Sequence, residues 1–101
     1  MPRPNLYIDV DGVILGREKP DDSAVVQARH AEAFLEFALA NFDCYWLTTH
    51  CDGDTRTVLA YLGRHCTDRF MARAAQVQPT KFGTWKTDAL RGDFYWVDDS
   101  P

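Results

Sequence analysis

Acidic residues cluster at two places in this chain, each time at the end of a short apolar run. Near the N-terminus the run carries Asp9 and Asp11, two positions apart, and near the C-terminus a second run ends in Asp98 and Asp99. Carboxylate oxygens are the ligands that hard divalent cations prefer, and such a cation brings anionic substrates with it. The two acidic pairs therefore predict a site for a divalent cation.

The first pair also has a catalytic interpretation. Alternate side chains of a strand point to the same face. If the strand continues through residue 11, Asp9 and Asp11 can therefore share a face, with Val10 pointing away. Asp9 can then act as a nucleophile and metal ligand, and Asp11 as a proton donor or acceptor. Taken alone, the same residues are equally typical of a strand end followed by an ordinary turn through Gly12.

Strands alternate with helices along the chain. Strands are predicted over residues 5–10, 43–47 and 94–97, with a further short strand over 74–77. Helices are predicted from residues 21–23 to about 41, from 52–54 to about 62, and from Thr80 or Thr84 to 91. This alternation predicts a parallel sheet covered on both faces, in which ligands bind beyond the carboxyl ends of the strands. The residues expected there are Asp9, Asp11, Thr48, Asp98 and Asp99.

Composition sets broad limits on the kind of protein. With 101 residues, 46% of them hydrophobic, the chain is expected to form a single domain over residues 1–101. The net charge of -4 predicts no non-specific binding to nucleic acid or to an anionic membrane. The strand expected directly after residue 4 leaves no room for a signal peptide, and the three cysteines have no paired spacing. We therefore expect a cytoplasmic protein with reduced thiols and no membrane-spanning segment.

Four segments, taken in order, resemble the motifs of the haloacid dehalogenase-like (HAD) superfamily. Residues 7–13 resemble the first motif, apolar residues followed by Asp-x-Asp-x-Thr/Val, and residues 44–48, an apolar strand ending in Thr, resemble the second. Lys86, or alternatively Lys81, resembles the lysine of the third motif, and residues 96–99 resemble the fourth. Each segment is a loose match by itself, but the ordered set is specific and spans nearly the whole chain.

The resemblance implies an α/β protein with a three-layer, Rossmann-like (HAD-like) fold, a small, mainly parallel sheet and no cap domain. It implies a Mg²⁺-dependent phosphatase with a phosphorylated substrate whose identity is unknown. In that reaction Asp9 attacks phosphorus and forms an aspartyl-phosphate intermediate, while Asp11 protonates the leaving oxygen and later activates water. Elementary chemistry agrees with this mechanism. A carboxylate attacks a phosphate dianion only if the repulsion between the two anions is neutralised, and here the cation and a lysine would neutralise it.

The resemblance also implies roles for the remaining residues. Mg²⁺ would be held by the Asp9 carboxylate, the Asp11 backbone carbonyl and an acid from Asp98 and Asp99. Thr48 would place its hydroxyl on a phosphate oxygen, although a threonine at a strand end is also explained by its β propensity. For the lysine we favour Lys86, because Thr84 can cap a helix whose first turn carries it.

Two departures from the family pattern bear on activity and assembly. The loops are too short to hold a folded cap domain, and the chain ends at Pro101, where family members usually continue into a further helix and strand. The missing part leaves an open edge strand, and a homo-oligomer is one way to cover it. A non-catalytic phosphate- or metal-binding HAD-like module is therefore the alternative function. A receiver-type signalling domain is a weaker candidate, because its acceptor Asp should end a middle strand, which here ends in Thr48.

Substitution of the two N-terminal acids tests the proposed chemistry. Asp9→Asn should abolish turnover while leaving the fold intact, because the amide is nearly isosteric with the carboxylate but does not attack phosphorus. Asp11→Asn should lower the rate by about 10²–10⁴-fold through loss of proton transfer. Phosphate release measures turnover, and circular dichroism measures whether the fold is retained. Near-native turnover by Asp9→Asn would disprove the covalent mechanism.

Overall fold

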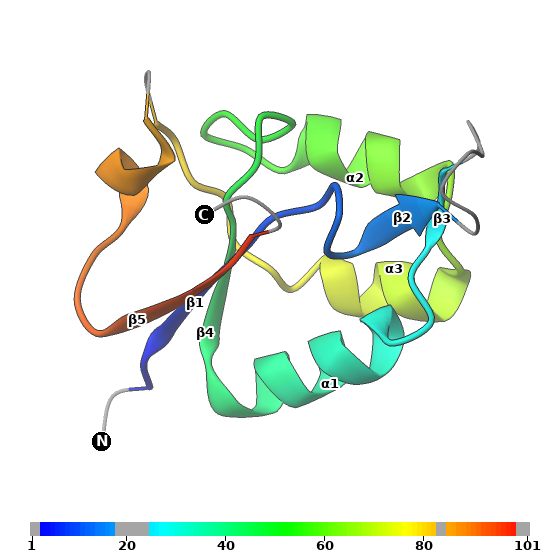
Figure 1. Ribbon diagram of the computed structural model, residues 1–101, viewed down its shortest axis with the longest axis horizontal. Helices are drawn as coiled ribbons and strands as arrows, with labels where there is room; N and C mark the ends of the chain where they lie inside the picture. The colour runs from blue at the N-terminus through cyan, green and yellow to red at the C-terminus, as the bar shows by residue number, and fades with distance from the viewer. Residues whose placement is uncertain (1–2, 18–24, 83–84, 99–101) are drawn as a thin grey trace.

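The computed structural model describes residues 3–17, 25–82 and 85–98 (Figure 1). These residues form a small α/β protein with a three-stranded parallel sheet and three α-helices, an arrangement compatible with a Rossmann-like fold. The elements, in chain order, are β1 (Asn5–Ile8), β2 (Leu15–Arg17), β3 (Val25–Gln27), α1 (Ala31–Asn41), β4 (Asp43–Trp46), α2 (Arg56–Gly63), α3 (Asp68–Ala74), the 3-10 helix η1 (Lys86–Ala89) and β5 (Phe94–Val97). None of the helices in the described ranges has the length and apolarity to cross a membrane.

The main sheet has the order β4-β1-β5, with both pairs parallel. Ile8, the last residue of β1, is in register with Trp46 at the end of β4 and with Val97 at the end of β5. The carboxyl ends of all three strands therefore lie at one edge of the sheet. The predicted parallel sheet is confirmed, and β1 is its central strand.

The two faces of this sheet are covered differently. Leu6 and Ile8 point into the main core together with residues of α1, α2 and α3, and these helices lie on one side of the sheet in Figure 1. On the opposite face Tyr7 stacks on Tyr45, with 5.3 Å between ring centroids, and its hydroxyl accepts a hydrogen bond of 3.0 Å from the Arg91 backbone N–H. Within the described residues, the four-residue η1 is the helix on this second face, where a full helical layer was expected.

A β-hairpin replaces the start of the first predicted helix. Residues 25–27 form β3, which pairs antiparallel with β2, and α1 begins only at Ala31. The β-branched Val25 and Val26 favour the strand, and the hydrogen bond from Ala28 N–H to the Ile14 carbonyl (2.8 Å) extends the hairpin. The prediction of a helix running through Val26 was wrong, and its expected start at residues 21–23 lies outside the described residues.

The short strand predicted over residues 74–77 is not formed either. Residues 68–74 form α3, whose N-terminus is capped by the Thr67 side chain, which accepts a hydrogen bond of 3.2 Å from the Phe70 N–H. The strand predicted over 74–77 was wrong, and a single parallel bridge between Gln78 and Tyr45 follows it instead. The last predicted helix is reduced to η1, and Thr84, its expected cap, lies outside the described residues.

Two phenylalanines provide a matched test of this packing. Phe70 on α3 is completely buried in the core, whereas Phe37 on α1 is 59% exposed. We expect Phe70→Ala to lower the free energy of unfolding by about 3–5 kcal/mol, because it removes a ring from a close-packed core. Phe37→Ala should lower it by less than about 1 kcal/mol. Urea denaturation of both variants measures the difference, and equal losses would contradict the placement of α3.

Candidate functional site

Asp9 and Thr48 lie at the carboxyl edge of the sheet. The Asp9 N–H donates to the Val97 carbonyl (3.0 Å), and the Leu47 N–H donates to the Ile8 carbonyl (2.9 Å). These bonds continue the strand pairing by one residue and bring the ends of β1, β4 and β5 together. Asp9 (6% exposed) and Thr48 (1%) are buried. Within the described part of the chain they are the two buried polar residues, if tyrosine, tryptophan and cysteine are not counted as polar. A buried polar residue is costly unless it has partners, so both positions need a structural or functional reason.

Lys86 supplies the partner of Asp9. Its Nζ lies 3.4 Å from Asp9 Oδ1 and 3.0 Å from Asp98 Oδ2, so one ammonium group bridges two carboxylates from neighbouring strands. Both carboxylates are nearly inaccessible, with the Asp9 side chain 9% exposed and that of Asp98 4%. Lys81 is exposed and has no ion pair within the described residues. The structure thus places Lys86, and not Lys81, beside the N-terminal acid.

The charges in this group influence one another. Burial raises the pKa of the Asp9 carboxyl, although the Val10 N–H (2.8 Å) and Lys86 favour its ionised form. Burial alone would lower the pKa of Lys86, but the hydrogen bond to Asp98 and the charges of both carboxylates raise it. Lys86 therefore remains an ammonium at neutral pH, and additional positive charge would favour ionised Asp9.

Asp11 has a different environment, because the strand ends before it. β1 stops at Ile8, and a tight turn follows in which the N–H groups of residues 13–15 all approach the Val10 carbonyl and Gly12 adopts a φ of 80°. Asp11 therefore does not follow the alternation of a strand. Its side chain is 55% exposed and contacts His50 and Tyr61.

Two hydrogen bonds hold the Asp11 carboxylate. Oδ1 accepts from the Tyr61 hydroxyl (2.8 Å), and Oδ2 lies 3.0 Å from His50 Nε2. Partial burial raises the pKa of Asp11, but the hydrogen bonds from His50 and Tyr61 together outweigh burial and lower it overall. The two acids of the first motif thus have pKa values shifted in opposite directions, because burial dominates at Asp9 and hydrogen bonds outweigh it at Asp11.

Thr48 links the sheet edge to the loop that carries His50. The Thr48 hydroxyl accepts a hydrogen bond of 3.3 Å from the His50 backbone N–H, which holds the start of this loop against the end of β4. From the sequence, His50 could contact substrate, although a polar loop residue was the favoured interpretation, and there was no signal for Tyr61. An aromatic residue one position before the buried Leu62 of α2 is ordinary in an amphipathic helix, and its contact with Asp11 depends on how α2 packs.

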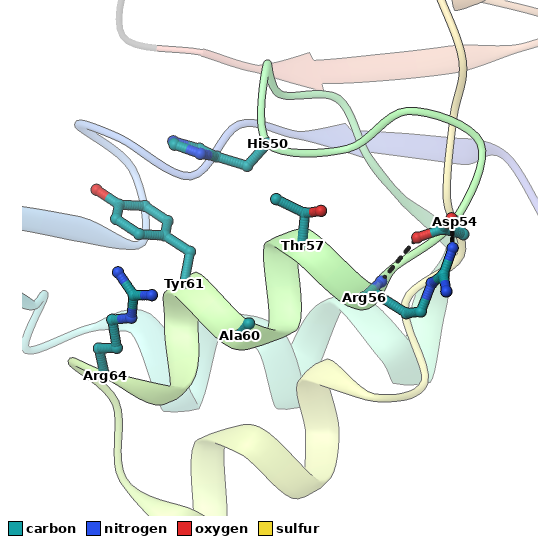
Figure 2. A pocket seen from close by; sticks show the side chains of 7 residues that line it. All are labelled: His50, Asp54, Arg56, Thr57, Ala60, Tyr61 and Arg64. Atoms are coloured by element: carbon teal, nitrogen blue, oxygen red, sulfur yellow. Dashed lines mark hydrogen bonds and ion pairs between the residues drawn. The ribbon is translucent and has the colours of Figure 1, made fainter.

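His50 and Tyr61, the two side chains that contact Asp11, also line a cleft of about 530 Å³ (Figure 2). One wall is a face of α2, and the other is the loop after β4. His50 and Tyr61 lie at one end, and the ion pair between Arg56 and Asp54 (3.1 Å) lies at the other. The residues that line the cleft are His50, Asp54, Arg56, Thr57, Ala60, Tyr61 and Arg64.

The predicted metal ligands are only partly brought together. Asp9 and Asp98 meet at Lys86, the Asp11 side chain turns toward His50 and Tyr61, and Asp99 lies outside the described residues. Within the residues that the structure describes, no group of three or more His, Cys, Asp or Glu side chains is arranged to hold a metal ion. Two carboxylates and a backbone carbonyl are nevertheless a donor set that suits Mg²⁺, which keeps several waters and binds few carboxylates.

Comparisons with protein-family models, with curated proteins and with solved structures found no match to this chain. The function is therefore inferred from the geometry of the residues at the sheet edge.

The bridge made by Lys86 leads to a prediction about stability. Loss of one partner from a buried ion pair typically costs roughly 3–5 kcal/mol, and because Lys86 is 24% exposed we expect Lys86→Ala to cost less, about 2 kcal/mol near neutral pH. Lys81→Ala is the matched control and should leave the free energy of unfolding nearly unchanged. Chemical denaturation of both variants measures these values.

The loss in Lys86→Ala should depend on pH. Burial already raises the pKa of Asp9, and without the ammonium beside it that pKa should rise further. A carboxyl whose pKa is higher in the folded than in the unfolded state destabilises the fold above that pKa and ceases to do so once protonated. The difference from wild type should therefore shrink as the pH falls toward about 4. If Lys86→Ala lowers the free energy of unfolding equally at neutral pH and at pH about 4, Lys86 does not act through its charge on Asp9.

Proposed function

We propose that this chain is a capless, HAD-like phosphatase that uses Asp9 as its nucleophile and depends on Mg²⁺. The observation that carries the proposal is the buried Asp9 at the end of the central strand, joined through Lys86 to Asp98 at the end of the neighbouring strand. Both strand ends and the lysine belong to the segments that resemble the HAD motifs. The group also lies beyond the carboxyl ends of parallel strands, which is where open α/β sheets bind their ligands.

The proposed reaction has two steps. In the first, an Asp9 carboxylate oxygen forms a bond to phosphorus, the bond between phosphorus and the leaving oxygen breaks, and Asp11 gives a proton to that oxygen. In the second, water attacks phosphorus, its proton passes to Asp11, and the bond to Asp9 breaks to release inorganic phosphate. Asp11 is half-exposed, and this accessibility suits a residue that exchanges protons with substrate and water.

Several residues would assist this reaction. Asp9, Asp98 and the Asp11 backbone carbonyl would hold Mg²⁺, with Asp99 as a further candidate from the sequence. The bound ion would neutralise charge on the phosphate as Asp9 approaches it. Lys86 would contribute to the same neutralisation, and Thr48 would donate its hydroxyl to a phosphate oxygen.

A non-catalytic phosphate- or metal-binding module is a second candidate, and one observation favours it. Lys86 already bonds both Asp9 and Asp98, so the group is held together without any ligand. A module of this kind would bind phosphate or metal but would not turn over. Turnover therefore separates the two functions.

Phosphate release is the test of the phosphatase proposal. A panel of nucleotides, sugar phosphates, phosphopeptides and nucleic-acid ends should include a substrate that the wild-type chain hydrolyses in Mg²⁺. Chelator should abolish this release, and Asp9→Asn, carried through the same purification, should show none. If Asp9→Asn and wild type release phosphate equally, a contaminant is the source and the proposal fails.

Thermal unfolding tests the metal independently of turnover. A cation that binds only the folded state raises the melting temperature by mass action, so millimolar Mg²⁺ should stabilise the wild-type chain. Asp98→Ala should remove most of that rise, whereas substitution of the exposed Asp68, on α3, should leave it intact. An unchanged melting temperature for wild type would argue against the metal site.

A further inference from the structure

Both oxygens of the Asp11 carboxylate are occupied by side chains from two other elements. Tyr61 lies on α2, and its hydroxyl donates to Oδ1 at 2.8 Å. His50 lies in the loop after β4, and its Nε2 is 3.0 Å from Oδ2. A half-exposed aspartate in a turn ordinarily samples several rotamers, whereas two hydrogen bonds on opposite oxygens select one.

The two donors are themselves held in place. The rings of His50 and Tyr61 are stacked, with centroids 4.1 Å apart and planes inclined by 23°, as Figure 2 shows from the side of the cleft. His65 packs edge-on against Tyr61 at 5.5 Å, and the His50 backbone is bonded to the Thr48 hydroxyl. The donors thus form a preorganised pair, and the cost of ordering them is met by packing rather than by the bond to Asp11.

The surroundings of this pair are charged. Lys86, on η1, acts on Asp11 through its charge. Arg64, directly after α2, lines the same cleft as His50 and Tyr61, as do Arg56 and Asp54 near the start of that helix. The other ionisable groups in direct contact with the pair are Asp11 and His65.

We propose that His50 and Tyr61 are positioning residues for Asp11, which hold its carboxylate in one orientation. The inference rests on the proposed phosphatase function, in which Asp11 carries the proton. It assigns the pair to the second step, where water attacks phosphorus, a proton of that water passes to the Asp11 carboxylate, and the bond between phosphorus and Asp9 breaks. A carboxylate held in one orientation keeps its accepting oxygen within reach of that water.

Tyr61→Phe is the primary test, because it keeps the ring and removes only the hydroxyl. We expect kcat to fall by about tenfold, corresponding to the loss of one charge-assisted hydrogen bond, with KM little changed. His50→Phe, which keeps a ring against Tyr61, should have a similar effect, and His50→Gln, which retains a donor, should recover part of the rate. Tyr95→Phe is the matched control, since Tyr95 is 61% exposed on β5 and packs against Phe42.

The side-chain rotamer of Asp11 provides a readout that a purely structural role would not change. The Tyr61 hydroxyl and His50 bond opposite oxygens of the carboxylate, so the wild-type Asp11 side chain should occupy one rotamer. Removal of the Tyr61 hydroxyl should move the NMR scalar couplings of the Asp11 β protons toward the average of several rotamers. Tyr95→Phe should leave these couplings unchanged.

The outcomes separate this inference from the proposed function. A Tyr61→Phe variant with unchanged kcat and an unchanged Asp11 rotamer overturns the positioning role. A lower kcat with an unchanged rotamer also overturns it, because the residue then does not act through the orientation of Asp11. If wild type releases no phosphate, the phosphatase proposal and the assigned step fail, while the couplings of the β protons still decide whether the pair orients Asp11.

Discussion

The parallel pairing of β1 with both of its neighbours is the constraint on which the candidate site depends. Ile8 is level with Trp46 on one side and with Val97 on the other. The residues that follow these positions therefore emerge at one edge, although they are separated by up to 89 positions in the chain between Asp9 and Asp98. A shift of one residue in either pairing would turn a whole strand over, because alternate side chains point to opposite faces. The alternation on β1, with Leu6 and Ile8 in the core, opposes such a shift.

Charge balance at this edge follows from the same pairing. Two carboxylates on adjacent strands face the Lys86 ammonium, and both carboxylate side chains are nearly inaccessible. Loss of one partner from such a buried group leaves the other charges uncompensated, so its members depend on one another. Burial is the largest cause of the raised pKa of Asp9, the charge of Asp98 adds to it, and the Lys86 ammonium opposes both. In the proposed function a divalent cation would favour the ionised carboxylates and allow an anionic substrate to approach.

The contrast between Asp9 and Asp11 shows how quickly the environment changes at the end of a strand. Asp9 still follows the sheet, with its N–H bonded to β5, and it is buried. Two residues later the chain has entered the turn that contains Gly12, and the Asp11 side chain reaches the loop after β4 and the face of α2. The position of Asp9 is thus set by strand pairing, whereas that of the Asp11 carboxylate is set by the side chains of His50 and Tyr61.

Periodicity and composition along the chain were sufficient to predict the α/β class, the parallel sheet, and the strands at residues 43–47 and 94–97. These features are local, because apolar runs of this length and their alternation with helices are visible in the sequence. The acids at the strand ends and Thr48 were also found in this way. The hairpin of β2 and β3 was missed because its strands have three residues each, too few to show a period. The segment at 74–77 was assigned as a strand because four residues do not distinguish a strand from the end of a helix.

What only the tertiary structure decided is which of these residues meet. The sequence by itself determined that acids follow strands β1 and β5, but not that Lys86 lies between Asp9 and Asp98, since Lys81 has the same chemistry and nearly the same position. It likewise contained no sign that Tyr61 bonds Asp11, fifty residues away. Contacts of this kind depend on the packing of whole elements, because the position of a side chain on α2 relative to a turn after β1 is set by every layer between them. Sequence periodicity predicts which face of a single helix or strand is buried. The candidate site consists of contacts between several elements, and periodicity does not predict those contacts.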